Sequence, residues 1–307
     1  MADAARDATF TFADPDGFVI FVRKWLPTPG IVSKAVVQIA HGAAEHSGRY
    51  ERFARYLNAA GYGVYANDHR GHGQTAGSKE QAGKAGPDGW NGIVRDAKLL
   101  TDIVRQENPH LPMFLFGHSL GSLLVQQYIQ AWGAGLRGAV LCGTFGALPN
   151  LDDLIAMAEK ESGDRPSPTF GAIFAAFNQP FGHGRTGFEW LSRDEAERQR
   201  YVDDPWFGFP FTSALVADCL KGARETWKPE NEARVPKDLP ILLVSGSQDP
   251  AGGNTQTVRL LMERYQALQL KDVTRRFYAG ARHDILNETN RDEVQGDILQ
   301  WLDRHAN

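Results

Sequence analysis

The stretch that decides the fold is Met-Phe-Leu-Phe-Gly-His-Ser-Leu-Gly at residues 113–121. Its first four residues are apolar, as in a short buried strand, and residues 122–129 carry apolar side chains at helical spacing. Between them lies Gly-His-Ser-Leu-Gly, which matches the G-x-S-x-G pattern of a sharp strand-to-helix turn with serine at its apex. Glycines suit such a turn because a Cβ would clash with neighbouring strands. The pattern therefore predicts that the Ser119 hydroxyl stands out of a sheet beside a helix N-terminus, which favours negative charge.

Composition and charge bound the class of protein. Of 307 residues, 42% are hydrophobic and 23% charged, as in ordinary globular proteins. The net charge is −4 and no basic block occurs, so we expect no nucleic-acid partner. No apolar run approaches the ~18 residues of a membrane span, and residues 1–7 lack the apolar core of a signal peptide. The only cysteines are Cys142, expected to be a buried free thiol, and Cys219, so we predict a cytoplasmic protein without disulfides.

Strand-like and helix-like segments alternate along the chain. Two β-rich runs at 9–12 and 18–25 flank Asp-Pro-Asp-Gly and predict an N-terminal hairpin. Further strands are expected at 35–40, 63–66, 113–116, 138–141, 241–245 and 273–278, and helices at 50–60, 93–106, 254–267 and 289–305. The alternation predicts an α/β fold with a mostly parallel central sheet covered by helices on both faces.

The alternation is interrupted between residues 148 and 234. No clean core strand occurs there, and Phe170, Ile173, Phe174 and Phe177 follow the i, i+3, i+4, i+7 spacing of a helix. A charged run at 189–200 is also expected to be helical. We therefore predict a core in two parts, 1–147 and 235–307, with an inserted helical cap at 148–234.

Ser119 requires partners to act as a nucleophile. A serine hydroxyl needs a base within hydrogen-bond reach, and the base needs an anionic partner. In folds with this serine turn, the three follow in the chain order Ser, acid, His. Asp249 follows the run 241–245 and His283 follows the run 273–278, at the C-terminal strand ends where open α/β sheets bind ligands. This order predicts a catalytic triad of Ser119, Asp249 and His283.

Other interpretations of these residues exist. Asp284 competes with Asp249 as the acid, but it directly follows His283 and is badly placed to face it. Asp238 precedes its strand and therefore lies at the wrong end of the sheet. Asp249 has a local alternative as a turn residue before proline, and His283 has one as a surface histidine of a loop.

An oxyanion hole is expected beside the serine. One donor is the backbone amide of the residue after the nucleophile, Leu120, and the other comes from the loop after the run 35–40. His41-Gly42-Ala43 lies in that loop, and the Ala43 amide is our candidate. Alternatively, His41-Gly42 shapes a tight turn, and both interpretations can hold together.

His69 and His72 could be interpreted as metal ligands, and His118 as a further catalytic group. His69 and His72, with Asp68, invite a metal-site interpretation, but H-x-x-H alone is a weak signal and no third ligand is fixed by spacing. We expect no metal, and we expect this glycine-rich loop to brace the sheet edge near the site. His118 is expected to be a packed, hydrogen-bonded neighbour rather than a second base.

Several motifs together resemble one family. They are His-Gly-Ala-Ala-Glu-His-Ser-Gly-Arg-Tyr at 41–50, Asn-Asp-His-Arg-Gly-His-Gly-Gln at 67–74, the serine turn at 117–121, Ser-Gly-Ser-Gln-Asp at 245–249 and His-Asp-Ile-Leu-Asn-Glu at 283–288. Together they resemble the monoacylglycerol lipase and lysophospholipase-like branch of the α/β-hydrolases. The resemblance covers 9–146 and 238 to the end and is thin across the cap. One departure is Ala44, where the branch has glycine, and its methyl group is expected to narrow the space beside the oxyanion hole.

The resemblance implies the α/β-hydrolase fold and a serine hydrolase for carboxylic esters of the monoacylglycerol or lysophospholipid type. Such an enzyme forms an acyl-enzyme, requires no metal or organic cofactor, and has a small-molecule or lipid ester as its partner. A thioesterase, amidase or peptidase with the same triad is the alternative among enzymes. A non-catalytic binding protein of this fold is a further alternative, although such a descendant is expected to have lost a triad residue, and all three are present here.

The predicted cap is unusually aromatic. Because ligand pockets are lined mainly by apolar and aromatic side chains, we expect Phe174, Phe177, Trp206 and Phe209 to line a substrate pocket, although each has an alternative role in packing the cap onto the core. The resemblance also implies transient contact of the run 170–181 with a membrane surface. That run is short and lacks a basic face, which weakens this expectation.

Overall fold

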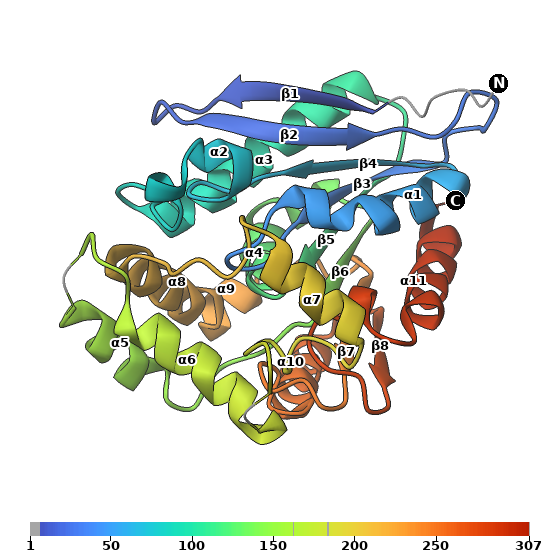
Figure 1. Ribbon diagram of the computed structural model, residues 1–307. Helices are drawn as coiled ribbons and strands as arrows, with labels where there is room; N and C mark the ends of the chain where they lie inside the picture. Colours follow the sequence, from blue (N-terminus) through green and yellow to red (C-terminus); the bar gives the residue numbers. More distant parts are fainter. Residues whose placement is uncertain (1–6, 162, 183, 307) are drawn as a thin grey trace.

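The computed structural model describes residues 7–161, 163–182 and 184–306. Its strands are β1 (Ala8–Ala13), β2 (Val19–Trp25), β3 (Ala35–Ala40), β4 (Tyr62–Asn67), β5 (Met113–His118), β6 (Gly138–Cys142), β7 (Ile241–Gly246) and β8 (Val273–Tyr278). They form one sheet in the order β1-β2-β4-β3-β5-β6-β7-β8 (Figure 1). The pairs β1–β2 and β2–β4 are antiparallel, and every other pair is parallel. The predicted hairpin and the mostly parallel sheet are confirmed.

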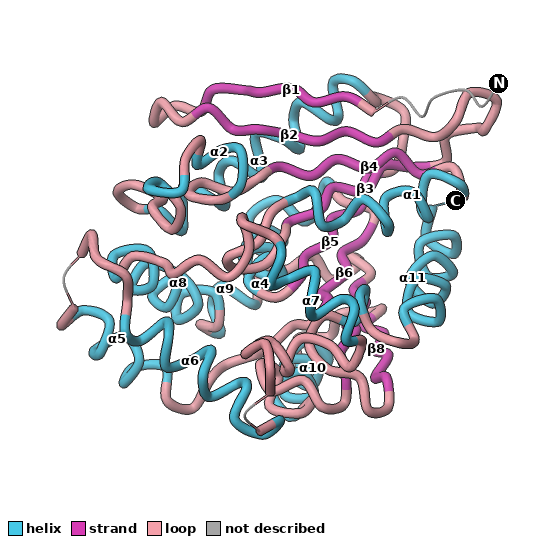
Figure 2. Tube along the Cα trace, viewed as in Figure 1, coloured by secondary structure: helices cyan, strands magenta, loops and turns pink. Residues whose placement is uncertain are grey.

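Helices cover both faces of this sheet (Figure 2). The helices that precede β6 or follow β7 are α1 (Glu51–Ala59), α2 (Gly73–Ala76), α3 (Gly89–Glu107), α4 (Leu120–Trp132), α10 (Gln256–Ala267) and α11 (Arg291–Ala306). The same parts of the chain contain the 3₁₀ turns η1 (Ser47–Tyr50), η2 (Lys79–Gln81), η3 (Gly133–Gly135) and η5 (Ile285–Asn287). Side chains alternate along β5, so Phe114 and Phe116 pack with α1 and α11 while Leu115 packs with α3, α4 and α10. The sheet therefore has one hydrophobic core on each face.

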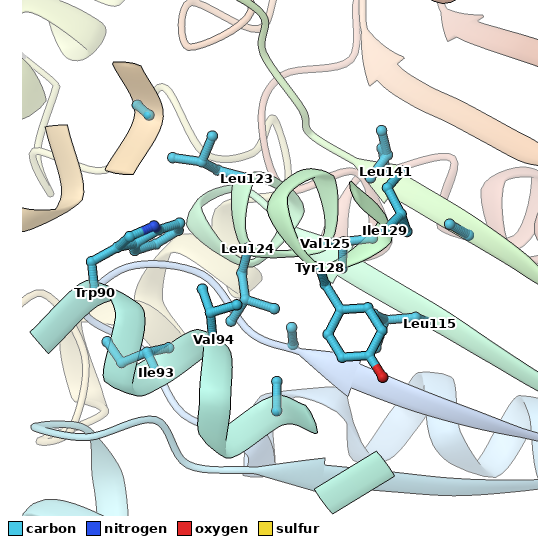
Figure 3. Packing of buried hydrophobic residues seen from close by; sticks show 14 of the residues in the cluster. Trp90, Ile93, Val94, Leu115, Leu123, Leu124, Val125, Tyr128, Ile129 and Leu141 are labelled. Atoms are coloured by element: carbon cyan, nitrogen blue, oxygen red, sulfur yellow. The ribbon is translucent and has the colours of Figure 1, made fainter. Parts of the chain in front are cut away.

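Helix α4 is fixed against the sheet directly behind Ser119. Its buried side chains Leu124 and Tyr128 meet Ile93 of α3 and Leu115 of β5 (Figure 3). Burying each such side chain contributes about 1.5–3 kcal/mol. A Cβ placed on Gly121 would lie 2.1 Å from the Ala40 carbonyl oxygen, so glycine is required for this close approach of helix and sheet.

The chain between β6 and β7 forms a helical insertion, as predicted. It contains α5 (Leu151–Glu159), α6 (Pro168–Asn178), η4 (Gln179–Phe181), α7 (Glu195–Asp203), α8 (Ser213–Thr226) and α9 (Pro229–Glu232). In Figure 1, α5 and α6 lie on the side of the molecule away from the β1–β2 hairpin. The expected helix over 189–200 is wrong in its first half. Helix α7 begins only after Asp194, whose carboxylate accepts hydrogen bonds from the amides of Ala196 and Glu197 and so caps the helix there.

The structure can be compared with the expectations about membrane spans and cysteines. Within the described ranges, no helix is long and apolar enough to cross a membrane. Cys142 and Cys219 are both free and buried. Residues 1–6, where we expect no signal peptide, lie outside the described residues.

Candidate active site

Ser119 lies at the apex of the turn between β5 and α4. Its backbone has φ 53° and ψ −121°, a region that residues with a side chain rarely adopt and that marks strained functional turns. The Ser119 side chain is partly exposed, whereas the strand residues before it are buried. The local sequence therefore produces the raised serine that its pattern predicts.

The structure brings the three predicted triad residues together at the C-terminal edge of the sheet. His283 Nε2 lies 2.8 Å from Ser119 Oγ, and His283 Nδ1 lies 2.9 Å from Asp249 Oδ1. Asp249 follows β7 and His283 follows β8, so three separate loops supply this hydrogen-bonded chain. His283 and Asp249 are 1% and 0% exposed. With the hydrogen on Nδ1, the imidazole donates to Asp249 and accepts from the Ser119 hydroxyl.

The surroundings of His283 favour its protonated form. Burial lowers the pKa of His283, but the Asp249 carboxylate, its hydrogen bond and the carboxylates of Asp284 and Glu45 outweigh burial and raise the pKa above 6.5, its ordinary value. A base whose pKa is raised by its carboxylate partner is suited to taking a proton from a hydroxyl group.

The competing carboxylates have other partners. Asp284 accepts hydrogen bonds from the Tyr201 hydroxyl at 2.7 Å and from Asn287 Nδ2 at 2.8 Å, and it also pairs with Arg49. Asp238 pairs with Lys271 on the surface. Among the three candidate acids, only Asp249 has a hydrogen bond to the imidazole in the described part of the chain.

The loop after β3 lies beside the serine, as expected for an oxyanion hole. A Cβ placed on Gly42 would lie 3.1 Å from the Ser119 Cβ. The Ala43 and Leu120 amides, the predicted donors, have no hydrogen-bond partner within the described residues. Ala44 has φ 54° and is 1% exposed. The positive φ explains why glycine suits this position, and the Ala44 methyl group is buried in the core.

Three buried histidines support this loop. His72 Nε2 accepts a hydrogen bond from the Ala44 amide at 3.3 Å, and His41 Nε2 accepts one from the His69 amide at 3.0 Å. Burial lowers the pKa of His69 to about 3 and that of His72 to about 4, so both are neutral near pH 7. Asp68 accepts from the backbone amide of Ser47 at 2.8 Å. These contacts correspond to the bracing role expected for the loop 67–74.

His118 differs from its expected state. It is buried and its ring centroid lies 4.9 Å from that of His283, as a packed neighbour should. However, its Nδ1 has no hydrogen-bond partner among the described residues, so the expectation of a hydrogen-bonded ring is wrong for this atom. Burial lowers the pKa of His118 and disfavours a second cation beside His283.

The predicted pocket residues occupy three different surroundings, and all are partly buried. Phe174 and Phe177 pack against Trp190, with ring centroids 5.4 and 5.0 Å away. Phe209 packs against His72, at 5.1 Å. Trp206 lies under the Lys79 ammonium group, 3.9 Å from the ring centroid. Phe174 and Phe177 therefore lie behind Trp190, whose ring lies against His283. Phe209 contacts the histidine loop instead, and Trp206 packs on a surface lysine.

Sequence reasoning missed Trp190 and Glu288. The Trp190 ring centroid lies 4.8 Å from that of His283, and Glu288 is a fully buried carboxylate five residues after the histidine. Trp190 belongs to an aromatic segment without regular period, so no pattern singled it out. Glu288 is the last residue of the motif at 283–288, one of the motifs on which the family resemblance rests. That motif is the sequence signal that could have identified Glu288.

Comparison with known proteins places the chain in a family. Residues 32–290 match the family described as serine aminopeptidase, S33. A monoacylglycerol lipase of Mycolicibacterium smegmatis is 29% identical, over 96% of this chain and 96% of that protein. Human monoglyceride lipase is 30% identical, over 95% of this chain and 89% of that protein. A thermostable carboxyl esterase from Bacillus coagulans, solved in complex with glycerol, is 28% identical with a TM-score of 0.90, covering 98% of this chain and 99% of that one.

These matches extend over nearly the whole chain, including the insertion, and agree with the sheet order and the serine turn. The chain therefore belongs to this α/β-hydrolase family, in the branch that contains the monoglyceride lipases. It is a carboxylic ester hydrolase.

Proposed function

We propose that this ester hydrolase cleaves esters of the monoacylglycerol or lysophospholipid type through an acyl-enzyme. Ser119 attacks the ester carbonyl while His283 Nε2 takes its proton, and Asp249 orients the imidazole and stabilises its cation. The supporting observation is the unbroken hydrogen-bonded chain from Ser119 Oγ through the imidazole to Asp249, with steps of 2.8 and 2.9 Å. His283 then donates its proton to the leaving alcohol. Water, activated by His283 in the same way, attacks the acyl-enzyme and releases the carboxylic acid.

The Ala43 and Leu120 amides bind the oxyanion in this proposal. Both are free to donate within the described part of the chain, and the Leu120 amide belongs to the first turn of α4, whose dipole favours negative charge. Removing one such donor typically lowers kcat by about a hundred-fold to a thousand-fold. The mechanism uses no metal and no organic cofactor.

The insertion supplies the acyl site in our proposal. Residues 148–234 act as a cap on a core formed by 1–147 and 235–307, and Phe174, Phe177, Trp206 and Phe209 line the path of the acyl chain. The names of the relatives support a glycerol ester as substrate. Helix α6 carries no charged residue, which supports transient contact of the cap with a lipid surface.

A peptidase or amidase activity is the second candidate, because the matched family is described as a serine aminopeptidase. A thioesterase with the same triad is the third candidate. All three share the acyl-enzyme mechanism and differ in the leaving group.

The test is kcat/KM for a series of monoacylglycerols and p-nitrophenyl esters of increasing chain length, beside an aminoacyl anilide and an acyl thioester. Each methylene buried in the acyl path contributes about 0.8 kcal/mol, so we expect kcat/KM to rise roughly four-fold per methylene until the path is filled. The variant Phe177→Ala should flatten this rise, and Phe10→Ala, on the outer strand β1, serves as its control. A preference for the anilide, or no dependence on chain length, would contradict the proposed substrate.

A further inference from the structure

Trp190 of the insertion lies directly against the imidazole of His283. The two ring centroids are 4.8 Å apart with their planes 30° from parallel, and Trp190 is 3% exposed. Its amide donates a hydrogen bond to Asn178 Oδ1 at 3.0 Å, and the Phe177 ring packs on the indole. The indole is therefore held in one place by the insertion itself.

The backbone around Trp190 also holds the loop that carries the base. The His283 amide donates to the Trp190 carbonyl at 3.2 Å, and the Asp284 amide donates to the Leu191 carbonyl at 2.8 Å. Ser192 Oγ donates to the Asn287 carbonyl at 2.8 Å. Three hydrogen bonds therefore hold the loop of His283 against residues 190–192 of the insertion.

We propose that Trp190 is a positioning residue that fixes the plane of the His283 imidazole and stabilises its protonated form. This inference rests on the proposed triad. When Ser119 attacks, its proton moves to His283 Nε2, and the imidazolium is positive for the lifetime of the tetrahedral intermediate. A cation beside the face of a tryptophan ring is attracted by the ring quadrupole, and burial strengthens this attraction.

The other groups facing His283 act in different ways. Asp249 accepts from Nδ1, Ser119 lies at Nε2, and the His118 ring lies 4.9 Å away. The carboxylates of Asp284 and Glu45 act on the imidazole through space. Among the described residues Trp190 forms no side-chain hydrogen bond with His283, so changing its ring removes neither of the two hydrogen-bond partners of the imidazole.

The first experiment is the pH dependence of kcat/KM for a short-chain ester, whose acid limb reports the pKa of the base in the free enzyme. Losing an attraction of this kind at a buried site should lower that pKa by about 1.5 units. In Trp190→Leu we expect a shift of this size together with a roughly thirty-fold fall in the plateau rate. Trp190→Phe, which keeps an aromatic face, should recover part of both. Trp132→Leu, at the far end of α4, is the control and should leave the acid limb unchanged.

The second experiment keeps the shape of the ring and works if Trp190→Leu does not fold. Wild-type protein and Trp190→Phe are produced with mono-, di- and trifluorinated tryptophan, which progressively weakens the ring quadrupole. The chain has 7 tryptophans, and Trp190→Phe removes only the one beside the base. We expect the acid-limb pKa to fall stepwise with fluorination in the wild type and to stay constant in Trp190→Phe.

The outcomes separate this inference from the proposed triad. An acid limb that is the same in wild type, Trp190→Phe and the fluorinated proteins would overturn the role of Trp190 and leave the triad intact. If Ser119→Ala keeps its ester hydrolysis, the triad itself fails. A fluorination shift of equal size in Trp190→Phe would assign the effect to another tryptophan and also overturn the inference.

Discussion

Glu288 offers a sharp test of how the insertion and the base are joined. It is fully buried, and its two oxygens accept five backbone and side-chain hydrogen bonds. Oε1 accepts from the Arg282 amide at 2.9 Å and from the Arg193 amide at 3.1 Å. Oε2 accepts from Arg193 Nε at 2.8 Å, from the Thr289 amide at 2.9 Å and from the Thr289 hydroxyl at 3.4 Å. This one carboxylate therefore connects the loop of His283 with the insertion.

The perturbation is Glu288→Gln, which keeps the size of the side chain and replaces one acceptor oxygen by an NH₂ group. At least two of the five hydrogen bonds are then lost, and the NH₂ group faces their donors. Hydrogen bonds to charged groups contribute about 1.5–3 kcal/mol each. Since the Arg193 side chain is 32% exposed, we take the lower value and expect the free energy of unfolding to fall by about 3 kcal/mol.

The assay is urea denaturation together with kcat and KM for a short-chain ester. We expect kcat to fall more than KM rises, because Glu288 orders the loop of the base and not the acyl site. Glu51→Gln is the control. Glu51 is 61% exposed and, among the residues that the structure describes, pairs only with Arg55, so the change should alter stability by less than about 0.5 kcal/mol. If Glu288→Gln unfolds at the same urea concentration as the wild type, or loses stability without losing kcat, the link between this carboxylate and the base is refuted.

Four further results are expected. Because the pKa of His283 is raised, kcat/KM should fall as the pH decreases, with the midpoint of this acid limb above pH 6.5. A midpoint well below pH 6.5 would contradict this. Asp249→Asn should lower kcat about 10⁴-fold. His72 titrates at about 4 in the folded chain and near 6.5 when unfolded, so its contribution to stability is complete above pH 6.5 and is lost as the pH falls toward 4. His72→Gln should therefore reduce the slope of unfolding free energy against pH by up to about 1.36 kcal/mol per unit in this window, and an unchanged slope would exclude this role. Ser119→Ala and the double variant Ser119→Ala/His283→Ala should have similar residual rates, whereas multiplicative losses would oppose a joint action.

The sequence predicted the main parts of the site because each carries a local signal. Glycine-flanked Ser119 follows an apolar strand, and Asp249 and His283 each follow another. In a parallel sheet the C-terminal strand ends share one edge, so the meeting of three distant loops follows from strand order alone. The start of α7 was not predicted but could have been, because Asp194 with Glu197 three residues later is a capping pattern.

The contacts between the insertion and the base were not predictable in the same way. Trp190 meets His283 across 93 positions in the sequence, and the distance between them depends on how α6, α7 and the intervening loop pack. No periodicity encodes such a contact, and the aromatic character of residues 170–211 fits packing and substrate binding equally well. The unpartnered Nδ1 of His118 is likewise a result of packing, since its neighbours come from three separate segments.

The central claim is that Ser119 is the nucleophile activated by His283, and covalent labelling tests it most directly. The protein is treated with a fluorophosphonate probe at pH 8, digested, and the modified residue is located by mass spectrometry. We expect one adduct, on Ser119, which disappears in Ser119→Ala and forms at least a hundred-fold more slowly in His283→Ala, as expected when the base of a triad is removed. An adduct on another residue, or an equal labelling rate in His283→Ala, would contradict the account.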